Sequence, residues 1–128
     1  MGNYFLNWAK YIMLAAAIYN LFWGAFISIQ PQIILFGNPP TTYMLILIRC
    51  IGMLVGVYGI AYYFSSTDPL RYWPLILVGL IGKVLGPVGA IYYVASGAMP
   101  STFLWVNVFN DLIWIWPFSW ILYRVWQS

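Results

Sequence analysis

The chain has no histidine, no glutamate and a single cysteine among its 128 residues. Histidine is the side chain most often used as a metal ligand and as a general base near neutral pH. Because Cys50 has no second cysteine to pair with, the chain can form neither an internal disulfide nor a C-x-x-C dithiol. These absences exclude a four-helix thiol oxidoreductase. We predict no catalytic residue, no metal site and no cofactor, although a lipid, a quinone or a pigment could bind.

Charged residues are also scarce, at 5% of the chain, whereas 64% of the residues are hydrophobic. A soluble domain averages about 25% charged residues, so this composition is typical of an integral membrane protein. The formal charge of +3 rests on five basic and two acidic residues, too few for a nucleic-acid surface. We therefore expect the lipid bilayer, and no nucleic acid, as a partner. The N-terminal region lacks a signal-cleavage pattern, so we expect its hydrophobic segment to be retained.

Four apolar segments are long enough to cross a bilayer, which takes about 20 helical residues. They are residues 8–29, 43–64, 73–95 and 102–123. With four crossings, Lys10, Arg71 and Arg124 all fall on one side, and the connections on the other side carry no charge. The positive-inside rule then places both termini in the cytoplasm, beneath the inner or plasma membrane of the cell. The sequence thus predicts an all-α polytopic membrane protein, in which residues 1–128 form a single antiparallel bundle of four transmembrane helices.

Glycines recur at three- and four-residue spacing along the second and third spans. Such small-residue stripes let helix backbones approach closely within a membrane. We predict that these glycines mediate helix packing: Gly52, Gly56, Gly59, Gly79, Gly82, Gly86 and Gly89. The pattern I-G-x3-G-x2-G-x2-Y-Y-x2-S occurs in both spans, which run in opposite directions. Helix packing alone is the favoured explanation, and inverted symmetry around a midplane site is the alternative.

Three ionisable residues lie within the predicted spans, together with three asparagines. They form the predicted intramembrane polar site: Arg49, Lys83, Asp111, Asn20, Asn107 and Asn110. A lysine near the middle of a bilayer costs about 3 kcal/mol by insertion scales, so it needs a partner or a purpose. Reflecting the last hairpin about its turn at Gly97 puts Lys83 and Asp111 at the same height, which predicts an ion pair. The pair has a purely structural interpretation, which we favour, and a second one as the base of a ligand or ion site.

Arg49 is then a surplus cation. It either extends toward the outer interface or receives an anionic or carbonyl-bearing ligand, such as a lipid headgroup or a quinone oxygen.

Together these features resemble the DoxX-like group of small four-helix membrane proteins. The resemblance is carried by a first helix that contains Gly24 and ends at Pro31, by Phe36-Gly37 in the external loop, and by Arg49 opening the glycine-rich second helix. The chain departs from the group by lacking the lysine that many members carry after a glycine late in the first helix. The resemblance implies a bundle that is often an accessory to membrane redox systems.

Three functions are compatible with these observations. We favour a non-catalytic accessory subunit that packs against a larger membrane complex, such as a redox complex, or binds lipid or a hydrophobic cofactor. The alternative is a small transporter or channel that uses the buried Asp111–Lys83 pair with Arg49. A membrane enzyme acting on a lipophilic substrate ranks last, because the chain has no histidine, glutamate or dithiol. We also expect a membrane-protein partner or a homo-oligomer.

Overall fold

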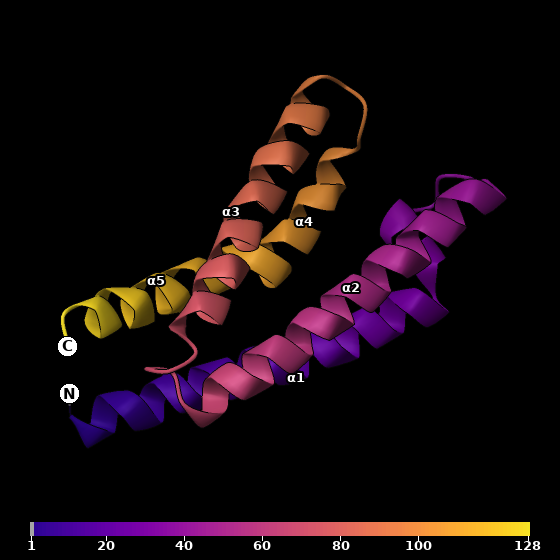
Figure 1. Cartoon of the computed structure of the whole chain (residues 1–128). Coiled ribbons are helices and arrows are strands. Elements are labelled where there is room, and N and C mark those ends of the chain that lie inside the picture. Colours follow the sequence, from indigo (N-terminus) through magenta and orange to yellow (C-terminus); the bar gives the residue numbers. More distant parts are fainter. Residues whose placement is uncertain (1) are drawn as a thin grey trace.

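The computed structural model describes residues 2–128, and this part of the chain consists of helices and their connections, without strands (Figure 1). The long helices are α1 (Asn3–Ile29), α2 (Thr42–Thr67) and α3 (Trp73–Ala95). The shorter elements are the 3-10 turns η1 (Pro31–Leu35) and η2 (Ser101–Phe103), α4 (Leu104–Asn107), the π-helical η3 (Val108–Leu112) and α5 (Ile113–Trp126). The helices α1, α2 and α3 are long and apolar enough to cross a membrane. The predicted all-α class is confirmed.

The predicted fourth span is not one regular helix. Residues 102–123 are divided among η2, α4, η3 and α5, and the chain bends between α4 and α5 (Figure 1). The amide of Ile113 bonds to the carbonyl of Val108, which is the five-residue spacing of a π-helix. Pro117, inside α5, has no amide proton to bond to the carbonyl of Ile113. The π-helical turn and the carbonyl without its usual helical partner therefore adjoin each other in the chain.

The helices α1 and α2 form a tight antiparallel hairpin, and glycines set its spacing (Figure 1). A Cβ atom added to Gly24 would lie 2.5 Å from the carbonyl oxygen of Gly52 and 2.5 Å from the amide nitrogen of Gly56. One added to Gly59 would lie 3.0 Å from the carbonyl oxygen of Ala17. The two backbones therefore touch where side chains are absent, as small-residue stripes permit.

The second hairpin consists of α3 and the C-terminal segment, and it meets the first hairpin mainly at one end of the molecule. The buried apolar core lies at this end: Ala9, Met13, Ala16, Ala17, Tyr62, Ile76, Phe118, Ile121, Leu122 and Val125. The guanidinium of Arg124 lies 4.6 Å from the ring centre of Phe5, which places the two chain termini at the same end. Toward the other end, the two hairpins diverge (Figure 1). The divergence leaves space between them at the height of the polar residues.

Candidate functional site

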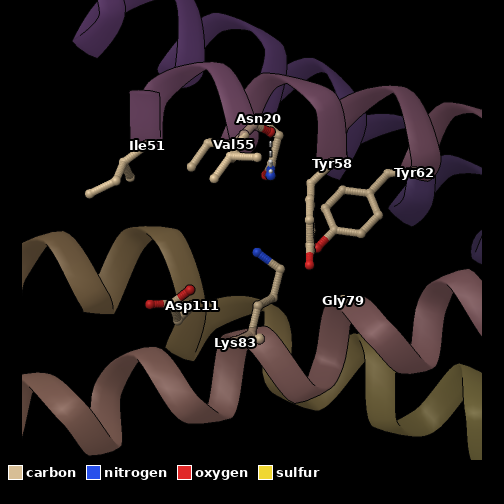
Figure 2. Close-up of a pocket in the computed structure, with 10 residues that line it drawn as sticks. Asn20, Ile51, Val55, Tyr58, Tyr62, Gly79, Lys83 and Asp111 are labelled. Atoms are coloured by element: carbon tan, nitrogen blue, oxygen red, sulfur yellow. Dashed lines mark hydrogen bonds between the residues drawn. The ribbon is translucent and has the colours of Figure 1, made fainter. Parts of the chain in front are cut away.

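A cavity of about 340 Å³ lies between the two hairpins, with α2 on one side and α3 on the other (Figure 2). Its polar lining comes from both hairpins and consists of Asn20, Tyr58, Tyr62, Lys83 and Asp111. Its remaining lining is Ile51, Leu54, Val55, Gly79 and Gly82. The cavity thus combines two opposite charges and two phenols with an apolar wall on α2.

Lys83 is buried, with 5% of its surface exposed. Its Nζ atom donates a hydrogen bond to the carbonyl oxygen of Asn110 at 2.7 Å. The same nitrogen lies 5.6 Å from the ring centre of Tyr62, 5.8 Å from that of Trp114 and 5.6 Å from that of Phe118. Aromatic ring faces attract a cation at these distances. One carbonyl and three rings therefore hold the ammonium group, and Figure 2 shows it directed toward α2.

Asp111 lines the same cavity, but a different neighbour holds it. Its Oδ2 atom accepts a hydrogen bond from Nδ2 of Asn107 at 3.0 Å. Among residues 2–128, no direct ion pair joins Asp111 to Lys83, so the predicted pair is not formed. Lys83 and Asp111, which were predicted to lie at the same depth, do line one cavity. The hydrogen-bond partner of Lys83 lies in the π-helical turn, which presents the carbonyl of Asn110, rather than the carboxylate of Asp111, to the lysine.

The three asparagines have three different roles. Asn20 Nδ2 donates to the carbonyl oxygen of Val55 at 3.2 Å, which ties α1 to α2 beside the cavity. The side-chain oxygen of Asn110 accepts from the Tyr19 hydroxyl and so connects the two hairpins. Asn107 is buried, and its Oδ1 atom has no hydrogen-bond partner. An unpaired buried acceptor is costly, so this atom marks a place where a donor would stabilise the protein.

Arg49 lies outside the cavity. Its Nη1 atom donates to the carbonyl oxygen of Ser28 at 2.6 Å, in the last turn of α1. The final carbonyls of a helix have no partner within the helix, and a positive charge is favourable there. Arg49 therefore caps α1, which has no basic residue of its own in its last turn. The structure thus separates it from the other charged residues of the predicted polar site.

The glycines of α3 differ in what they contact. A Cβ atom on Gly79 would lie 2.5 Å from the Tyr62 ring, and one on Gly86 would lie 3.0 Å from Oδ2 of Asp111. Gly82 faces open space except for a carbon of Tyr58 at 3.9 Å, and Gly89 has nothing within 4 Å. Gly79 and Gly86 therefore make room for cavity residues.

Sequence reasoning missed the aromatic side chains around Lys83. Tyr58 and Tyr62 are four residues apart on α2, and Trp114 and Phe118 are four apart on α5, so each pair lies on one helix face. This spacing was a usable signal.

The chain matches no family model, no curated protein and no solved structure. The DoxX-like resemblance therefore stays a prediction, and function has to be argued from the cavity.

Proposed function

We propose that this protein is a non-catalytic membrane protein that crosses the bilayer four times and holds the polar end of a lipid or similar amphiphile between its two hairpins. One observation carries the proposal. The buried ammonium of Lys83 has three donor hydrogens but a single hydrogen-bond acceptor, and it faces a cavity. An ionisable residue within a membrane-spanning segment is a candidate functional group by default.

The cavity has the dimensions and lining of a small-molecule site. Its volume of about 340 Å³ falls within the range of about 300–1,000 Å³ that such sites occupy. A few polar groups converge against apolar side chains, an arrangement that fixes the orientation of a ligand. Two phenol hydroxyls, from Tyr58 and Tyr62, add donors near the ammonium.

An amphiphile fits better than a water-soluble molecule because of the apolar wall. Ile51 and Leu54 line the cavity and are 51% and 61% exposed. On a helix that crosses a membrane, exposed apolar side chains contact the hydrocarbon. The cavity would therefore open sideways to acyl chains, with its polar groups further inside.

Binding is favoured over catalysis by the partners of the two charged residues. Lys83 bonds to a backbone carbonyl and Asp111 to an amide group, and neither is hydrogen-bonded to a nucleophile. An adjacent general base is the usual means of activating a hydroxyl or thiol nucleophile, and neither residue acts on such a group here. An accessory role in a redox complex, which the DoxX-like resemblance implies, is compatible with the same site, because quinone carbonyls would accept from the same donors.

Mass spectrometry of the intact protein, purified in mild detergent, tests the proposal. We expect the unmodified protein to retain about one lipid molecule per chain, and Lys83→Met to lose at least about tenfold in lipid affinity, as expected for a lost charged hydrogen bond. Lys10→Met is the matched control, because Lys10 is the other lysine, is exposed, and lies outside the cavity. Equal retention by both variants, at equal thermal stability, would contradict the proposal.

A transport function predicts a different result. Solute flux into proteoliposomes that stops in Asp111→Asn, while the protein stays folded, would favour the transporter alternative.

A further inference from the structure

The cavity contains one cation and one anion that do not pair with each other. Lys83 is held by a carbonyl and aromatic rings, and Asp111 is held by the amide of Asn107. Opposite charges in a low-dielectric interior attract strongly, and an uncompensated buried charge is costly. A ligand that carries both charges would neutralise each of them without moving either side chain from its present partner.

We infer that the ligand is a zwitterionic phospholipid headgroup that carries a primary amine, such as phosphoethanolamine. Its phosphate would bind at Lys83 and its ammonium at Asp111. This inference rests on the proposed function and names the ligand class for the same cavity.

The end of the cavity near Lys83 is suited to a phosphate. In Figure 2 the hydroxyl groups of Tyr58 and Tyr62 extend to the same region as the lysine nitrogen. Gly79 lets the Tyr62 ring come this close to α3. An ammonium with spare hydrogens and two phenols together offer several donors, and phosphate oxygens accept several hydrogen bonds at once.

The end near Asp111 is suited to a primary ammonium. Asn107 occupies Oδ2 of the carboxylate, and no residue among 2–128 donates to Oδ1. An ethanolamine ammonium has N–H groups to donate to Oδ1 of Asp111, whereas a choline group has none. The site should therefore discriminate between these two zwitterions.

The apolar side chains on the α2 side of the cavity favour a lipid over a free zwitterion as the ligand. The exposed side chains of Ile51 and Leu54 give the acyl chains of a lipid an apolar path along α2. A soluble zwitterion would leave these side chains without a partner.

Lipid-binding measurements on the full chain, with phosphatidylethanolamine, phosphatidylcholine and phosphatidylglycerol of identical acyl chains, test the inference. We expect the ethanolamine lipid to bind at least about tenfold more tightly than the glycerol lipid, as expected for a charge-assisted hydrogen bond. Asp111→Asn should remove this preference. Asp68→Asn should keep it, because Asp68 is the other carboxylate and lies in the exposed connection between α2 and α3.

A second variant tests the same prediction if Asp111→Asn fails to fold. Gly86→Ala keeps both charges but adds a methyl group 3.0 Å from Oδ2 of Asp111, so it should also weaken the preference for ethanolamine. Tight binding of the glycerol lipid that is lost in Lys83→Met would overturn this inference and leave the proposed function standing. Failure of every lipid to bind would overturn both. Soluble glycerophosphoethanolamine binding as tightly as the lipid would overturn the lipid as the source of the headgroup.

Discussion

The contact between α1 and α2 at Gly24 predicts a large effect from a single added methyl group. In Gly24→Ala the new carbon would lie 2.5 Å from the oxygen of Gly52 and 2.5 Å from the nitrogen of Gly56. Both are backbone atoms, so no change of rotamer relieves the overlap. The two helices must separate locally, and the hairpin loses part of its packing.

The magnitude follows from two opposing terms. Overpacking of a well-packed contact costs about 1–3 kcal/mol. Alanine gains about 1 kcal/mol over glycine in the interior of a helix. Gly89→Ala isolates the second term, because nothing lies within 4 Å of its added carbon. The free energy of unfolding should therefore be about 1–3 kcal/mol lower for Gly24→Ala than for Gly89→Ala.

Reversible unfolding in mixed detergent micelles, followed by far-UV circular dichroism, measures this difference. We expect Gly89→Ala to unfold at the same or a higher denaturant concentration than the unmodified protein, and Gly24→Ala at a lower one. Equal free energies of unfolding for the two variants would refute the close backbone contact between α1 and α2.

Three further predictions concern the polar residues. A double-mutant cycle of Lys83→Met and Asp111→Asn should give a coupling energy below about 3 kcal/mol in delipidated protein, because each side chain is hydrogen-bonded to a different partner. A coupling energy of about 3–5 kcal/mol would indicate a direct buried pair. Arg49→Leu should lower the free energy of unfolding by about 0.5–1 kcal/mol through loss of the α1 cap and leave lipid retention unchanged; impaired retention would place Arg49 in the site. Tyr19→Phe should speed amide exchange in η3, because the hydroxyl holds Asn110; unchanged exchange would contradict that role.

Hydrophobicity and helix length predicted three helices well. The predicted spans 8–29, 43–64 and 73–95 lie within α1, α2 and α3, whose apolar runs leave few alternatives in a bilayer. The C-terminal segment could not be predicted in the same way. Its π-helical turn depends on where Asn110 and its neighbours find partners, and those partners lie on other helices.

The depth of the site residues along the bundle was predictable, but the direction of their side chains around the helix axis was not. Reflection about a turn gives the depth of a residue, so Lys83 and Asp111 were expected at the same level, and both line one cavity. The rotation of a side chain about its helix depends on local helix type, and the π-helical turn changes that rotation after Asn107. The partner of Arg49 was not predictable, because it is the backbone carbonyl of Ser28, and residue type does not indicate which backbone carbonyls are free to accept.

The most direct test of the central claim is a nitrogen–phosphorus distance measurement by solid-state NMR in phosphatidylethanolamine bilayers. The chain has only two lysines, so labelling lysine with nitrogen-15 gives signals from Lys10 and Lys83 alone. We predict that the lipid phosphorus dephases the Lys83 signal, and that this dephasing persists in Lys10→Met and disappears in Lys83→Met. A Lys83 signal with no phosphorus dephasing would contradict the account.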